Sequence, residues 1–244
     1  AAEIDARSKF HHDSIAMGDY GPNCHGTDHV GGRFGGEHNG EFYHRVAPYQ
    51  IPYGVLVSDP NREGAIDNLL VPGAVSSSHV GFCALRLEPI WMALGQAAGH
   101  AAHIAKSGEV AVQSVTVSKL QTRLHESGAA TIYISDLMPG DDGFSLAQWW
   151  GSRGGFHGLA DSPKIYGDRA ANIVGQYYLP YENHAANLGQ PMDQRIYEVW
   201  KPLAIKMGVD EAKIPGLMPQ VTRGDWLSVV RTATNQDGVS DSGR

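Results

Sequence analysis

The sequence predicts an α/β protein that ends in a helical appendage. Residues 69–71 form a short apolar run bounded by Pro72 and Gly73, the pattern of a strand buried on both faces. A glycine- and serine-containing turn and a long helix with Glu88 and Pro89 in its first turn follow this run. After the breaker cluster at residues 138–143, the chain becomes a series of amphipathic helices.

The long helix has recognisable ends. Pro89 suits the first helical position, because its missing N–H has no intrahelical partner there. Lys106 in the last turn, followed by Gly108, indicates the C-terminus. Small residues recur every three or four positions, which predicts a face that lies close to another backbone. These residues are Gly95, Ala98, Gly99 and Ala102.

Further elements are expected on both sides of residue 139. Residues 110–112 are expected to be extended, residues 117–126 to form a helix, and residues 130–134 to form a short strand. The appendage is expected to contain helices near Ser145 and over residues 168–178, 192–207 and 223–232, the last with Thr222 as its N-cap. Its aromatic residues are expected to be core, with a carbohydrate-stacking platform as the alternative. These are Trp149, Trp150, Trp200 and Trp226.

Composition sets limits on function. The 244 residues with 42% hydrophobic content can bury a sizeable core. A net charge of −7 argues against nonspecific nucleic-acid binding, and no apolar run reaches transmembrane length. The two cysteines are too few for a disulfide framework, so two unpaired thiols are favoured over a bridge.

Several ordered motifs carry a family resemblance. Residues 76–79 read S-S-S-H, residues 86–89 read R-L-E-P, and residues 95–102 read G-Q-A-A-G-H-A-A. Upstream, residues 48–53 read P-Y-Q-I-P-Y, and a D-Y…H segment precedes them. This order resembles the C-terminal flavin-contacting part of bacterial FAD-dependent oxidoreductases of the two-dinucleotide-domain type.

The resemblance implies a division of the chain. Residues 1–67 would be a loop-rich segment over the active site, and residues 68–139 the C-terminal part of a Rossmann-like FAD-binding domain. Residues 140–234 would be the helical appendage, and residues 235–244 a frayed tail.

The expected G-x-G-x-x-G turn for the ADP half of FAD is missing. Residues 31–36 come nearest, but no apolar strand precedes them and no helical pattern follows. We therefore expect a split or processed chain that is inactive alone, with a companion chain supplying the nucleotide domain. A periplasmic or secreted location is favoured over a cytoplasmic one.

The resemblance also assigns site residues. Arg86 would bind flavin or substrate, with a local pair to Glu88 as the alternative. The proton acceptor would be His25, His29 or His79, since a histidine titrates near neutral pH. Tyr49 and Tyr53 would wall the substrate pocket or pack in the core. The residues expected to contact FAD are Ser77, Ser78, His79, Arg86, Leu87, Glu88, Pro89 and Ile90.

The activity implied is hydride transfer from a hydroxylated small molecule, by analogy a sugar or polyol, to FAD. Two alternatives remain open at this point. One is a noncatalytic interaction subunit of a flavoprotein complex. The other is a metal-dependent hydrolase with ligands from a histidine-rich N-terminal segment. Its candidate ligands are His11, His12, Cys24, His25, Asp28, His29, Glu37, His38, Glu41 and His44.

Overall fold

A computed structural model describes residues 10–24, 42–43, 46, 48–157, 159 and 185–236. The helix expected over residues 168–178, the glycine-rich residues 31–36, and His25 and His29 fall outside the described residues.

The described strands form two small antiparallel sheets. In the first, β1 (Ser14–Gly18) pairs with β4 (Tyr49–Pro52), with Gly18 opposite Tyr49. In the second, β2 (Asn23–Cys24) pairs with β3 (Phe42–Tyr43). The mixed α/β class is supported in this coarse form, and no parallel pair occurs among the described strands.

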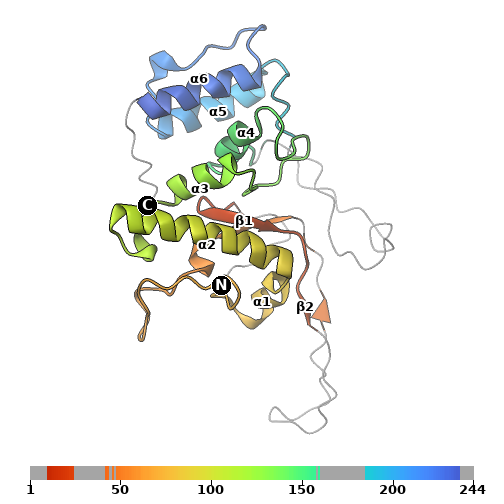
Figure 1. Cartoon of the computed structure of the whole chain (residues 1–244). Coiled ribbons are helices and arrows are strands. Elements are labelled where there is room, and N and C mark those ends of the chain that lie inside the picture. The colour runs from red at the N-terminus through yellow and green to blue at the C-terminus, as the bar shows by residue number, and fades with distance from the viewer. Residues whose placement is uncertain are drawn as a thin grey trace.

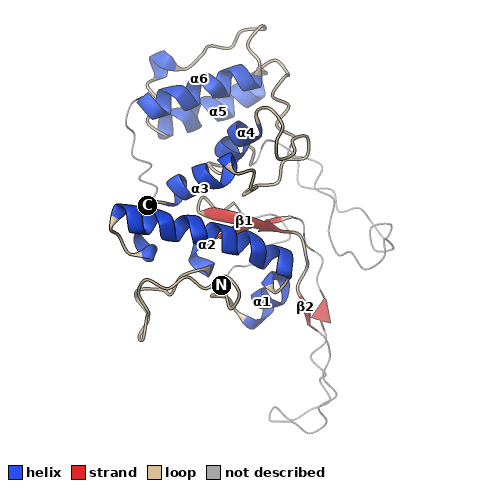
Figure 2. Ribbon diagram, in the orientation of Figure 1, coloured by secondary structure: helices blue, strands red, loops and turns tan. Residues whose placement is uncertain are grey.

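Helices account for far more of the described chain than strands do (Figure 2). Between them lie short 3-10 turns at Tyr53–Val55, Val112–Ser114 and Glu211–Lys213. The helices are α1 (His79–Leu85), α2 (Glu88–Gly108), α3 (Val117–Glu126), α4 (Phe144–Gly151), α5 (Gln194–Lys206) and α6 (Arg223–Gln236). Within the described ranges, none of these helices has the length and apolar character needed to cross a bilayer.

The first core forms around α2, which lies along β1 (Figure 1). This helix buries one apolar face against the sheet and α3. The face consists of Ile90, Leu94, Ala97, Ala98, Ala101 and Ala105. Of the four small residues, Ala98 is buried, whereas Gly95, Gly99 and Ala102 are exposed, so the predicted close approach of another backbone at the two glycines is not made within the described residues.

The second core belongs to the helical appendage. Three tryptophans are fully buried: Trp150, Trp200 and Trp226. The Trp150 ring packs edge to face against the other two, with centroid-to-centroid distances of 5.5 Å to Trp200 and 5.8 Å to Trp226. Trp200 Nε1 donates a hydrogen bond to the carbonyl of Gly155 at 2.6 Å, and a Cβ at Gly155 would collide with the Trp150 indole. The prediction that the tryptophans are core residues is confirmed.

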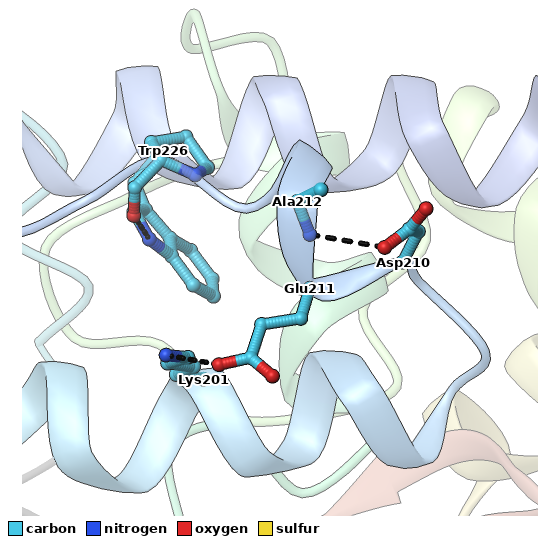
Figure 3. A network of polar contacts seen from close by, with 6 residues as sticks. Lys201, Asp210, Glu211, Ala212 and Trp226 are labelled. Atoms are coloured by element: carbon cyan, nitrogen blue, oxygen red, sulfur yellow. Dashed lines mark hydrogen bonds and ion pairs between the residues drawn. The ribbon is translucent and has the colours of Figure 1, made fainter.

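A connecting loop is tied to both α5 and α6 (Figure 3). Lys201 of α5 pairs with Glu211 at 2.6 Å, and Asp210 accepts a hydrogen bond from the Ala212 N–H at 3.0 Å. Trp226 Nε1 donates to the carbonyl of Pro215 at 3.1 Å. The loop is therefore held to α5 by an ion pair and to α6 by the Trp226 indole.

Several predicted elements are confirmed. Helix α3 has the expected bounds, and α2 begins at Glu88 with Pro89 in its first turn. Thr222 caps α6 as expected: its Oγ1 accepts from the Asp225 N–H at 3.1 Å, while Asp225 accepts from the Thr222 N–H. The predicted end of α2 is displaced by one residue, because Gly108 stays helical and Glu109 adopts the left-handed conformation with φ of 52°.

Two predicted strands are wrong, and the predicted extended segment at residues 110–112 is only partly correct. Residues 69–71 form a loop in which Leu69 is 43% exposed, so the apolar run does not enter a sheet. In residues 110–112, Ala111 is extended, but Val112 begins a 3-10 turn and its N–H bonds to the side chain of Asn68 rather than to a strand. Residues 130–134 are not a strand, and side chains satisfy the backbone groups of Thr131 and Ile132.

A buried polar network centred on Thr131 replaces that strand. The Thr131 carbonyl accepts from Ser14 Oγ at 2.7 Å and from Gln50 Nε2 at 3.1 Å. Gln148 of α4 accepts from the Thr131 and Ile132 N–H groups and donates to the Ile132 carbonyl, all within 3.1 Å. The network thus joins β1, β4 and α4 at the boundary between the two cores.

Removing the Gln148 amide should destabilise the whole protein. In Gln148→Leu, two buried N–H groups and one buried carbonyl lose their partner, so we expect a loss of at least about 2 kcal/mol. Urea unfolding followed by tryptophan fluorescence measures this loss. The control is Gln96→Leu, which removes an exposed bond to Ser127 and should cost within about 0.5 kcal/mol. Equal losses in the two variants would contradict the expected role.

His125 should make stability depend on pH. Burial, followed by the positive charges of Arg153 and Arg231, lowers its pKa from 6.5 to about 3. The native state therefore excludes a proton that the unfolded state binds below pH 6.5, and stability falls as pH drops from 6.5 toward 3. The loss approaches about 1.4 kcal/mol per pH unit.

Urea unfolding between pH 6.5 and 5, before most carboxylates titrate, isolates this effect. His125→Gln should flatten the dependence, whereas His103→Gln, on the exposed face of α2, should retain it. An unchanged slope in His125→Gln would show that other groups cause the acid sensitivity.

Candidate functional site

The candidate site is the turn between α1 and α2. Ser78 caps α1, and its Oγ accepts a hydrogen bond from the Gly81 N–H at 3.1 Å. Arg86 ends α1 and Leu87 precedes α2, so only these two residues separate the helices. The S-S-S-H and R-L-E-P motifs therefore lie at the opposite ends of one short helix, α1, and lead directly into the long one.

The N-terminus of α2 is open. Leu87 occupies the N-cap position and provides no side-chain cap, while Glu88 and Pro89 are exposed. A helix N-terminus carries backbone N–H donors without intrahelical partners and a partial positive charge. This end of α2 can therefore receive a carbonyl or anionic oxygen.

Arg86 lies beside this N-terminus. Its Nη2 donates to the carbonyl of Asn23 at 3.3 Å, and its Nε is buried with no hydrogen-bond partner in the described part of the chain. The described contacts of Arg86 include no ion pair with Glu88. A local pair with Glu88 therefore does not explain where the Arg86 side chain lies. The Arg86 guanidinium can therefore donate a further hydrogen bond, from its Nε, to a ligand.

Tyr49 and Tyr53 are buried in the first core, at 6% and 5% exposure. Tyr49 Oη contacts the carbonyls of Tyr20 and Ala84 at 3.1 and 3.2 Å, and Tyr53 Oη donates to the carbonyl of Val112 at 2.7 Å. Burial raises the pKa of Tyr53 to about 12, and burial together with the Asp19 charge raises the pKa of Tyr49. Both phenols stay protonated near neutral pH, and a role in a substrate pocket stays a prediction.

The structure also brings together three side chains that the sequence analysis did not group. The ligand atoms of Cys24, His79 and Cys83 all lie within 4.8 Å of one another. Burial, and next the Cys24 side chain, raises the pKa of the Cys83 thiol, while Arg86 opposes this shift. The spacing of His79 and Cys83 was the available signal, because residues four apart share one face of a helix.

Other predicted residues lie elsewhere. His25 and His29, like most of the histidine-rich set, are outside the described residues. A cleft of about 610 Å³ lies between the C-terminal end of α2 and α3, lined by residues such as Ser107, Lys119 and Arg123. A helix of 21 residues is about 30 Å long, so this cleft is remote from the turn before α2.

A comparison with protein families gives one match. The family described as FAD dependent oxidoreductase matches residues 2–124, which is about half of the 244 residues. The matched range includes both motifs at the turn and the full length of α2. No curated protein and no solved structure gives a significant match.

Proposed function

Because the chain belongs to the FAD dependent oxidoreductase family, we propose that the turn between α1 and α2 is where its residues contact FAD. The observation that carries this proposal is the open N-terminus of α2 beside a guanidinium with a buried, unpartnered Nε. These donors fit the cofactor, because a flavin ring has carbonyl oxygens that gain negative charge on reduction.

The roles of individual residues follow from their positions. FAD, when bound, accepts a hydride from the substrate. The backbone N–H groups of Glu88 and Ile90 would donate to a flavin carbonyl, and the positive end of the α2 dipole would favour this contact. Arg86 would add a charged donor, whereas Ser77 and Ser78 lie at the opposite end of α1 and stay proposed flavin contacts. Ser78 must also hold its bond to the Gly81 N–H, which fixes the start of α1.

The proposed reaction oxidises a hydroxylated small molecule. Bound FAD would supply the hydride acceptor for the C–H bond, and a histidine would take the O–H proton, which would leave a carbonyl product. His25 and His79 are the candidate proton acceptors, with His29 as a further one. A sugar or polyol substrate rests on family analogy alone, because the buried tryptophans of the appendage offer no stacking platform.

We further propose that the ADP half of FAD is held by a nucleotide domain outside these 244 residues. The support is the exposed face of α2, where Met92 is 74% exposed next to Gly95 and Gly99. A helix with small residues on an open face allows a second backbone to approach closely. Such a domain would cover this face and complete the cofactor site.

Flavin binding tests the proposal. Native mass spectrometry of the protein from its own source should show the chain in a particle that carries one FAD. Replacing Arg86 by Met in that assembly should weaken FAD binding roughly 10–100-fold, the loss of one hydrogen bond to a charged group.

The matched control is Arg62→Met, since Arg62 is exposed in a loop away from the turn. Arg86→Lys retains the charge and separates loss of charge from loss of packing. A flavin-free particle, or FAD binding by Arg86→Met equal to that of the control, would contradict the placement of the cofactor.

A further inference from the structure

The two cysteines of the chain come from distant parts of the sequence and meet beside α1. Cys24 lies in β2, and Cys83 lies on α1, which contacts β2. Figure 1 shows α1 and β2 next to each other at one end of α2. Cys83 is 5% exposed and Cys24 is half-buried, so the pair lies just below the surface.

A histidine completes the group. His79 is the first residue of α1 and lies one turn before Cys83, so both side chains project from the same face of the helix. His79 is exposed, and its imidazole reaches the two thiols from the solvent side. Two thiols alone would suit a disulfide as well as a metal, whereas a converging imidazole is a feature of metal sites.

The distances suit a small divalent ion. Tetrahedral Zn²⁺ bound by sulfur at about 2.3 Å and nitrogen at about 2.0 Å separates its ligand atoms by about 3.6–3.8 Å. Here the three ligand atoms lie within 4.8 Å, so closure requires a movement on the order of 1 Å. The exposed His79 side chain can make this movement without disturbing the core.

The charges of the three side chains also suit a divalent metal ion. Two thiolates and a neutral imidazole would bind Zn²⁺ as a neutral unit. Within the described residues, no other place brings together three side chains of this kind.

We propose that Cys24, His79 and Cys83 form a Zn²⁺ site that fastens β2 to α1 and leaves a fourth position for water. The site differs from the histidine-rich set considered from the sequence, since it shares only Cys24 with that set. It also leaves His25 or His29 as the proton acceptor of the proposed oxidation, because a metal-bound His79 cannot serve in that role.

Metal and thiol titrations of the full chain under reducing conditions test the proposal. We expect one Zn²⁺ per chain by elemental analysis, and Co²⁺ in its place should give thiolate-to-metal charge-transfer absorption. Because the chain contains only two cysteines, every thiol signal reports on this site. Both thiols should react slowly with a disulfide reagent when Zn²⁺ is present and rapidly after chelation.

Variants separate a metal site from mere proximity. His79→Ala should lower Zn²⁺ affinity more than about 100-fold, since even changes outside the ligand set cost 10–100-fold. His79 is exposed, so the variant should fold, and His103→Ala is the control with an exposed histidine on the next helix. Cys24→Ser should abolish the charge-transfer band of one thiolate.

Two results would overturn the proposal. One is the absence of stoichiometric metal in the reduced chain. The other is a His79→Ala variant that binds Zn²⁺ as tightly as the control, which would leave a dithiol pair without a histidine ligand. Neither result depends on flavin, so the proposed cofactor site is tested separately.

Discussion

The structure depends on the hydrogen bonds that converge on Thr131. This residue is fully buried, and its carbonyl, N–H and hydroxyl groups all have partners. The partners come from β1, β4, α3 and α4, elements that otherwise belong to two separate hydrophobic clusters. Because an unpaired polar group in this position would be costly, the network fixes how the two clusters meet.

The position of α2 follows from this arrangement. One face of the helix packs on β1 and α3, and both of those elements are held by the network, through Ser14 and His125. Its N-terminus then projects beyond the core without a side-chain cap. The proposed cofactor contacts and the proposed metal ligands both lie at this end, so a rigid scaffold supports the residues assigned to chemistry.

The sequence predicts most of the described helices but misses α1, which lies where a turn was expected, and it predicts the extended segments poorly. Local signals in the sequence predict these helices. For α3 the signal is the spacing of its apolar residues, and for α6 it is the N-cap residue Thr222. Residues 69–71 and 130–134 have the composition of strands, but whether they pair depends on distant partners. At residues 131–132 the partner is the side chain of Gln148, which no local pattern reveals. The proximity of Cys24 and Cys83 could not be predicted from local sequence for the same reason, since 58 residues lie between them in the chain.

Hydrogen exchange of the wild-type chain tests most directly whether the Thr131 network makes the two cores one cooperative unit. The best-protected amides of α2 and of α6 should open with the same free energy, and added urea should lower both in parallel. That result would show that the appendage and the body unfold together. If α6 opened at much lower free energy while α2 stayed protected, the appendage would be an independent unit, and the central role of Thr131 would be contradicted.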